Sequence, residues 1–217
     1  MDKDAFYRRY ITTHFLFIGT PLRLNQKLRT YFKINYLNFL PRNKQARILD
    51  LGCGSGVLLE WLRELGYSNL LGIDISEEQV KYCKRKGLHV LKSDVFDFLR
   101  STKKNFDVIF MQDLIEHFKK QEAITLLHLV YEHLKTGGIL IGRTPNMSNP
   151  LLGISARYID FTHEIGFTDT SLHQLLSIIG FKEIVILPEK LGTTVIRRLI
   201  AKLLYSVSNS VMRGLFW

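Results

Sequence analysis

The sequence predicts an α/β fold of the Rossmann-like, doubly wound type, with a mostly parallel seven-stranded sheet and helices on both faces. Short apolar runs alternate with amphipathic segments along most of the 217 residues. Such alternation produces βαβ units, whose right-handed crossovers place parallel strands between two layers of helices. In the stretch RILDLGCGSG, three glycines at alternate positions follow the first apolar run. This fold class binds ligands beyond the carboxyl ends of its strands, where we expect that loop to lie.

The strands expected from the sequence are short apolar runs rich in branched side chains. The six that can be located cover residues 46–51, 69–75, 88–94, 106–113, 139–144 and 181–187. The helices between them show apolar residues at helical spacing and have recognisable ends. They cover residues 21–40, 56–65, 77–87, 119–138 and 168–180. Ser76 and Gln79, for example, have the spacing of a capping box, and Gly87 ends the helix that they begin.

The composition indicates a folded globular protein that is located in the cytoplasm. Hydrophobic residues make up 46% of the chain, which is enough for a full core. The two cysteines have neither metal-type spacing nor a disulfide framework, and we find no signal peptide and no apolar run that could span a bilayer. We divide the chain into an N-terminal helical substrate lid (1–44), a core (45–190) and a basic amphipathic C-terminal helix (191–217).

The glycine loop is compatible with three nucleotide-type ligands, and the neighbouring residues distinguish them. A phosphate-binding loop needs a lysine after its last glycine, and a dinucleotide loop needs a glycine there, but Val57 occupies that position. Asp50, Asp74 and Asp94 end three successive strands. Three acids suit a ligand that carries an ammonium group, a ribose and an adenine amine, whereas they would repel a pyrophosphate.

The chain resembles the class I S-adenosylmethionine-dependent methyltransferases in five motifs that occur in the family's order. These motifs are ILDLGCGSG, GIDIS, SDVFDF, FDVIFMQDLIEHF and LKTGGILIGRTPN, and the resemblance runs from about Arg47 to Leu187. It is similar in particular to O-methyltransferases of polysaccharide gene clusters and of ubiquinone biosynthesis. The resemblance implies S-adenosylmethionine as the cofactor. The residues that it assigns to cofactor binding are Asp50, Gly52, Gly54, Gly56, Asp74, Ile75, Asp94, Val95 and Gln112.

The resemblance also implies a role for each of these residues. The glycines let the backbone approach the methionyl part of the cofactor, which Asp50 contacts directly or through the loop. Asp74 would hold the ribose hydroxyls, Asp94 and Val95 would meet the adenine, and Gln112 would line the site near the methionine group. A simple helix N-cap is the competing explanation for the acids, because it is also common at strand ends.

A second set of residues is suited to activating the acceptor. A hydroxyl nucleophile must lose a proton, so a base or a metal ion is expected near the methyl donor. Asp113, Glu116 and His117 would share one face of a helical turn, and His163 lies in the loop that covers the substrate in this fold. The resemblance to metal-assisted methyltransferases implies a divalent cation bound by these four residues. As alternatives, His117 and His163 act as general bases or only pack against the substrate.

The acceptor predicted from these resemblances is a hydroxyl on a small-molecule or lipid-linked sugar, such as a glycolipid precursor. Residues 145–169 form a long loop with Arg157 and Tyr158 as candidate contacts. The alternatives are O-methylation of a polyprenylated catechol in quinone biosynthesis and a non-catalytic S-adenosylmethionine-binding module. A nucleic-acid partner is disfavoured despite the net charge of +10, because no stripe of aromatic and basic residues stands out.

The C-terminal stretch VIRRLIAKLLYSVSNSVMRGLFW has apolar residues at helical spacing, with most basic residues off that stripe. Such a helix lies on a membrane surface, packs on its own domain or packs on a partner. The sequence therefore leaves peripheral membrane contact and a homodimer open.

Overall fold

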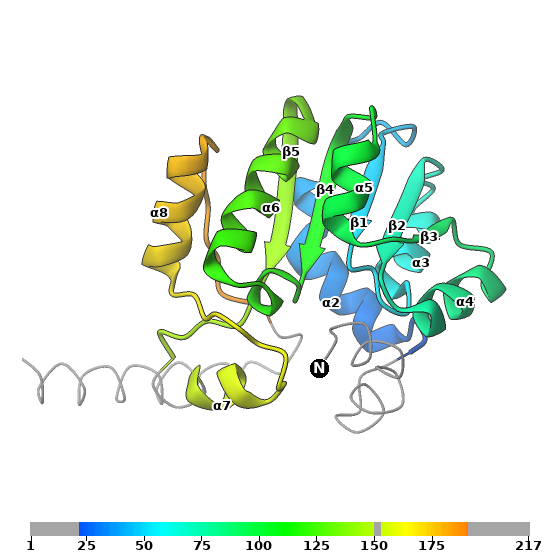
Figure 1. The fold of residues 1–217 in the computed structure, drawn as a ribbon. Helices are drawn as coiled ribbons and strands as arrows, with labels where there is room; N and C mark the ends of the chain where they lie inside the picture. The colour runs from blue at the N-terminus through cyan, green and yellow to red at the C-terminus, as the bar shows by residue number, and fades with distance from the viewer. Residues whose placement is uncertain (1–21, 150–152, 191–217) are drawn as a thin grey trace, which may run out of the picture.

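The computed structural model describes residues 22–149 and 153–190. Its strands are β1 (Ile48–Leu51), β2 (Leu70–Asp74), β3 (Val90–Lys92), β4 (Phe106–Gln112) and β5 (Leu134–Arg143). They form one sheet in the order β3-β2-β1-β4-β5, and every neighbouring pair is parallel. Figure 1 shows this sheet between two layers of helices. The predicted α/β class and the parallel sheet are confirmed.

The helical elements include the five expected from the sequence, in the expected order, and also helices over residues 95–101 and 153–158 that the sequence did not predict. They are α2 (Gln26–Tyr36), η2 (Leu37–Phe39), α3 (Val57–Glu64), α4 (Glu77–Arg85), α5 (Val95–Ser101), η3 (Ile115–His117), α6 (Lys120–His133), α7 (Gly153–Tyr158) and α8 (Asp169–Ile179). Ser76 caps α4 by accepting a hydrogen bond from the Gln79 backbone, as predicted. In the described ranges no helix combines the length and the apolar character that crossing a bilayer requires.

The prediction of seven strands is wrong for the described residues, which form five. Residues 181–187 have strand composition but form no strand. Val185 and Leu187 are more than half exposed, so this segment is not packed as a further buried strand. Soon after it, the Lys190 backbone makes two hydrogen bonds with the Asn35 side chain, at 2.9 and 3.0 Å. The chain is therefore held against α2 instead of extending the sheet.

The core lies on both faces of the sheet, and alternate residues of β1 face opposite layers. Leu49 and Leu51 pack in a cluster with residues of α5, α6 and α8. Ile48 packs instead with Phe32 of α2 and Trp61 of α3. All four β1 residues are buried, as expected for a strand with helices on both sides. Apolar side chains thus pack against both faces of the central strands.

The strand order places a topological switch between β1 and β4. From β1 the chain moves outward to β2 and β3, then returns to β4 and continues outward to β5. The connections that leave β1 and β4 therefore diverge, which opens a crevice at the carboxyl ends of these strands. In Figure 1 the strands point toward the end of the molecule that carries α7. The predicted site residues lie at this end.

Candidate active site

The glycine loop of residues 52–56 joins β1 to α3 through left-handed backbone conformations. Gly52, Gly54 and Gly56 have φ angles of 69°, 52° and 74°, which residues with side chains rarely adopt. A Cβ atom at Gly56 would lie only 2.5 Å from a Leu88 methyl carbon. A Cβ atom at Gly52 would lie 2.9 Å from a methyl of Leu114, so the loop also contacts the segment that follows β4.

Asp74 ends β2 and holds the glycine loop in place. Its two carboxylate oxygens accept hydrogen bonds from the backbone N–H groups of Gly54 and Ser76, each at 2.8 Å. Burial raises the pKa of Asp74 to about 6, and the two N–H donors oppose that shift. Asp74 therefore orders the loop in addition to any contact that it makes with a ligand.

Asp50 lies beside Asp74 in the neighbouring strand. Its side chain is buried within β1. Burial, and then the charge of Asp74, raise the pKa of Asp50 to about 8. Two buried carboxyl groups at adjacent strand ends favour a cationic group nearby, because a positive charge would stabilise both ionised forms.

The other predicted cofactor residues lie along the same edge of the sheet. Asp94 caps α5, since its Oδ1 accepts a hydrogen bond from Phe96 N at 2.7 Å, so a helix-capping role accounts for this residue as well. Val95 is buried in the core, and the half-buried Ile75 directly follows β2. Gln112 ends β4, and its buried Nε2 has no hydrogen-bond partner among the described residues. A buried amide nitrogen of this kind needs an acceptor.

Glu116, His117 and His163 come together from two separate segments. Each offers one ligand atom, and these atoms all lie within 4.8 Å of one another. The two imidazole rings meet edge to face, with their centroids 4.8 Å apart. A carboxylate and two imidazoles are ligands suited to zinc, iron or manganese, so this cluster could hold a divalent cation.

Glu116 is the most buried member of the cluster, with 1% of its surface exposed. Oε2 accepts a hydrogen bond from Thr144 Oγ1 at 3.0 Å, whereas the buried Oε1 has no partner among the described residues. Burial, followed by the charge of Asp113, raises the pKa of Glu116 to about 8. The Glu116 carbonyl accepts a hydrogen bond from Glu164 N at 2.8 Å, which brings the His163 loop to the cluster.

His163 has a defined orientation. Its Nδ1 lies 3.1 Å from the carbonyl oxygen of Ala156, which can only accept a hydrogen bond. Nδ1 therefore carries the proton in the neutral ring, and the lone pair is on Nε2. Arg157, a candidate substrate contact, instead donates to the backbone carbonyls of His163 and Glu164. It stabilises the loop that carries His163.

Asp113 is not brought into the cluster, although the D-x-x-E-H spacing predicted it there. It adopts a left-handed conformation, with φ of 46°, so the helical turn does not begin at this residue. Arg143 of β5 donates to both of its carboxylate oxygens, with a distance of 3.0 Å from Nε to Oδ1. Arg143 also donates to the Tyr31 hydroxyl at 3.0 Å, which links the pair to α2.

Comparison with known proteins identifies the family. Residues 24–185 match the family model described as a methyltransferase domain. The chain belongs to the methyltransferase domain family. The ubiquinone biosynthesis O-methyltransferase of Chelativorans sp. is 32% identical over 124 residues, which cover 52% of this methyltransferase and 47% of the relative. The enzyme of the same name from Idiomarina loihiensis is 29% identical over 139 residues, which cover 59% and 53%.

A solved structure supports the fold of this methyltransferase over most of its length. The crystal structure of a SAM dependent methyltransferase from Archaeoglobus fulgidus matches with a TM-score of 0.64 and 26% identity. The match covers 85% of this chain and 88% of that protein. The methyltransferase spans only about half the length of the curated relatives that it matches.

The residues present fit the S-adenosylmethionine that the sequence resemblance implies. The unpartnered Nε2 of Gln112 is a donor at the end of β4. Asp50 and Asp74 provide buried carboxyl groups at the ends of β1 and β2, which suits a ligand with a cationic group and hydroxyls. The left-handed glycine loop between them has no side chains that would block access to its backbone at three positions.

Sequence reasoning missed several residues that support the methyltransferase site. Cys83 donates from Sγ to the Gly54 carbonyl at 3.2 Å, and Lys86 donates from Nζ to the Ser55 carbonyl at 2.9 Å. Both residues lie about 30 positions from their partners in the chain, and no local pattern points to them. Thr144 could have been found, because it directly follows β5 within the motif LKTGGILIGRTPN. Thr162, which contacts His117, lies beside His163 in the predicted substrate loop.

Proposed function

We propose that this chain is an S-adenosylmethionine-dependent O-methyltransferase in which Glu116, His117 and His163 activate the acceptor hydroxyl. The observation that carries the proposal is the convergence of these three side chains, whose ligand atoms lie within 4.8 Å of one another. Leu114, two residues before Glu116, lies against Gly52 of the glycine loop. The activating cluster and the candidate cofactor loop are thus neighbours at one edge of the sheet.

The side chains divide the chemistry of this reaction between them. S-adenosylmethionine supplies an electrophilic methyl group, so the protein mainly aligns the acceptor oxygen with it and excludes water. Glu116 in its ionised form has a buried oxygen without a partner among the described residues, and His163 has a lone pair on Nε2, so both are then suited to receiving a proton or binding a cation. A divalent cation at this cluster would lower the pKa of an acceptor hydroxyl.

The acceptor class is best supported as a catechol of the quinone type. The curated relatives cited above are named ubiquinone biosynthesis O-methyltransferases. A sugar hydroxyl is the second candidate, but its support is weaker because Arg157 is engaged with the backbone of its own loop. Peripheral membrane contact and a homodimer through residues 191–217 stay predictions, because that segment lies outside the described residues.

The test begins with binding. Isothermal titration should detect S-adenosylmethionine binding to the full chain. Methyl transfer is then measured with polyprenylated catechols and with sugar or glycolipid acceptors, with and without a chelator. We expect turnover with a catechol. If the cluster uses a cation, adding a chelator should lower that turnover. Binding without turnover on any acceptor would favour a non-catalytic module.

The Glu116→Gln variant tests the cluster itself. It keeps an oxygen that can accept from Thr144 but removes the ionisable carboxyl group. We expect methyl transfer to fall by about 100-fold or more, as for loss of a general base, with little change in cofactor binding. The control is Glu132→Gln, an exposed carboxylate of α6. Turnover that is unchanged in Glu116→Gln contradicts the role given to the cluster.

A further inference from the structure

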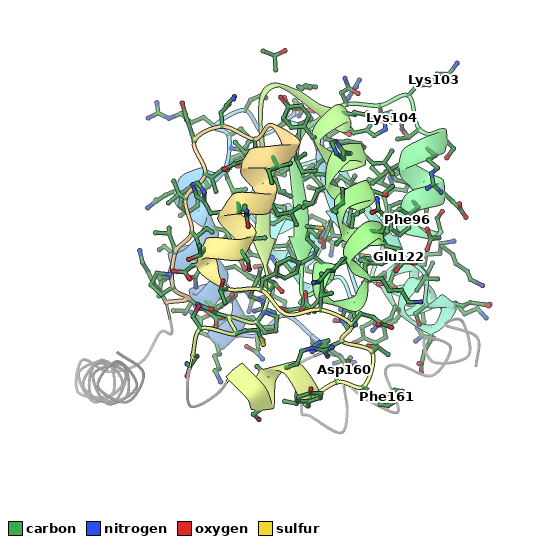
Figure 2. All side chains as sticks on the ribbon, turned by 60° about the vertical axis from the view of Figure 1, so that its left-hand side comes forward. Phe96, Lys103, Lys104, Glu122, Asp160 and Phe161 are labelled. Carbon is green, nitrogen blue, oxygen red and sulfur yellow. The ribbon has the colours of Figure 1, made fainter. Side chains whose placement is uncertain are left out.

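A chain of hydrogen bonds reaches His117 from the loop that follows α7. Thr162 Oγ1 lies 2.7 Å from His117 Nδ1 and also 2.7 Å from Asp160 Oδ1. Asp160 is a buried acid with 5% of its surface exposed. Figure 2 labels Asp160 and its neighbour Phe161 in this loop, at the end of the molecule where the strands point. Neither Asp160 nor Thr162 was identified from the sequence.

The direction of these hydrogen bonds follows from the chemistry of the groups. A threonine hydroxyl has one proton, and Asp160 Oδ1 is an acceptor, because it also accepts a hydrogen bond from the Thr162 backbone N–H. The Thr162 proton is therefore donated to Asp160, so the hydroxyl oxygen must accept from His117. His117 then carries its proton on Nδ1, and in the neutral ring the lone pair is on Nε2.

The chain of hydrogen bonds from Asp160 through Thr162 to His117, which we call the relay, gives His117 the same proton position as His163. His163 donates from Nδ1 to the Ala156 carbonyl, as described above. Both imidazoles are therefore held in the same tautomer, although each uses a different acceptor. In an unconstrained neutral histidine the proton prefers Nε2, which would remove the lone pair that a cation or an acceptor proton requires. Each ring thus needs a partner that fixes its proton on Nδ1.

We propose that Asp160 and Thr162 are positioning residues that fix the tautomer and the ring orientation of His117. This inference deepens the proposed function and rests on it for its catalytic meaning, but the tautomer itself is a property of the ligand-free protein. A carboxylate that is linked to a metal-binding or basic histidine raises the basicity of the other ring nitrogen, which then binds a cation or a proton more strongly. Here the link is a hydroxyl.

Thr162 is a better probe than Asp160. The Asp160 carboxylate also accepts a hydrogen bond from the backbone N–H of Thr162, at 2.8 Å, so removing this side chain would disturb the turn. Thr162→Val replaces the hydroxyl by a methyl group of similar size, which removes the link between His117 and Asp160 but keeps the Thr162 backbone N–H that bonds to Asp160. Thr162→Ser restores the hydroxyl. Thr170→Val, at an exposed position of α8, is the matched control.

The direct measurement is the histidine tautomer, read from long-range 1H–15N correlation spectra of the full chain at a pH where the rings are neutral. Loss of the His117 signals in His117→Gln assigns them. We expect the Nδ1-protonated form in the wild type, Thr162→Ser and Thr170→Val, and a shift toward the Nε2-protonated form in Thr162→Val. An Nε2-protonated wild type, or an unchanged tautomer in Thr162→Val, would overturn the proposal.

The second measurement is titration with Zn²⁺ alone. Loss of an outer partner of a histidine ligand typically lowers metal affinity by about 10- to 100-fold, which we expect for Thr162→Val but not for Thr162→Ser. The two proposals can fail separately. A tautomer that shifts as expected in a protein that methylates no acceptor would support the relay and count against the proposed function. Methylation that depends on Glu116, together with an unchanged tautomer in Thr162→Val, would support the proposed function and contradict the relay.

Discussion

Asp74 holds the glycine loop in place and is also the proposed contact of the cofactor ribose. It accepts hydrogen bonds from the backbone of Gly54 and Ser76. Its removal would therefore loosen the glycine loop and also remove the proposed contact with the ribose. Each lost hydrogen bond to a charged group is worth about 1.5–3 kcal/mol. We therefore expect Asp74→Ala to weaken S-adenosylmethionine binding by about 10- to 100-fold in isothermal titration. A folded variant that binds as tightly as Asp97→Ala, an exposed control on α5, would remove Asp74 from the site.

The buried acids also predict how stability depends on pH. The pKa is raised to about 8 for Asp50 and Glu116, compared with an unfolded value near 4, so the native state holds protons that the unfolded chain releases. Their stabilisation is complete below about pH 4 and is lost as the pH rises to about 8. Each group contributes a slope of at most about 1.4 kcal/mol per pH unit.

Asp50→Asn isolates one of these contributions. Between pH 6 and 8 we expect the variant to lose about half of the decline in unfolding free energy, because Glu116 supplies the rest. Urea unfolding of the ligand-free protein at several pH values measures this. Asp97→Asn, whose side chain is exposed, should follow the wild type. An identical decline in Asp50→Asn and the wild type would contradict the expectation.

At the residue scale, the sequence located most of the candidate site but not its internal contacts. The motifs led us to expect that Glu116, His117 and His163 come together, and the structure brings their ligand atoms within 4.8 Å of one another. Asp113 was misplaced because the spacing argument assumes a continuous helical turn, whereas this residue is left-handed and bound to Arg143. A pairing between residues 30 positions apart leaves no periodic signal in the sequence.

At the scale of elements, α3 offers a controlled test of the glycine loop. Gly56 is the N-cap of this helix and Gly66 follows its C-cap, and both have positive φ. A Cβ at Gly66 would meet nothing within 4 Å, whereas one at Gly56 would meet Leu88 and Cys83. Gly66→Ala should therefore cost only the left-handed backbone strain, about 1–2 kcal/mol of unfolding free energy.

Gly56→Ala should cost about 1–3 kcal/mol more than Gly66→Ala, because it adds overpacking to the same strain. It should also weaken S-adenosylmethionine binding, which Gly66→Ala should leave unchanged. Urea unfolding and isothermal titration measure the two effects. Equal costs for the two variants would show that the loop yields to accommodate the extra atom.

Most element types could be predicted from periodicity, and the errors lie where tertiary contacts decide. The helix expected over 119–138 ends at His133, and β5 begins at Leu134 opposite Phe106 of β4. The run 181–187 has the composition of a strand, but it contributes no strand to the described sheet. Local composition indicates that a segment can form a strand. Whether a neighbouring strand is available to pair with it depends on the whole fold.

At the scale of the whole molecule, α2 belongs to the core although it precedes the first strand. Phe32 is 3% exposed and packs near Trp61, whereas Ile34 on the same helix is 37% exposed. Phe32→Ala should cost about 3–5 kcal/mol in urea unfolding, the usual cost of truncating a buried aromatic side chain. Ile34→Ala should change stability by less than about 0.5 kcal/mol. Similar small effects at both positions would mean that α2 does not unfold with the core. The assignment of residues 1–44 as a substrate lid stays a prediction.

The reversal of strand order between β1 and β4 has a consequence for how such a chain can diverge. Most candidate donor-binding residues lie between positions 50 and 95, in the half built on β1, β2 and β3. The cluster proposed to activate the acceptor, Glu116, His117 and His163, lies in the half built on β4 and β5. After gene duplication, changes in the second half can alter which molecule is modified while the first half is inherited intact. Proteins that descend from one ancestor can in this way use the same methyl donor and differ in the molecule that receives the methyl group.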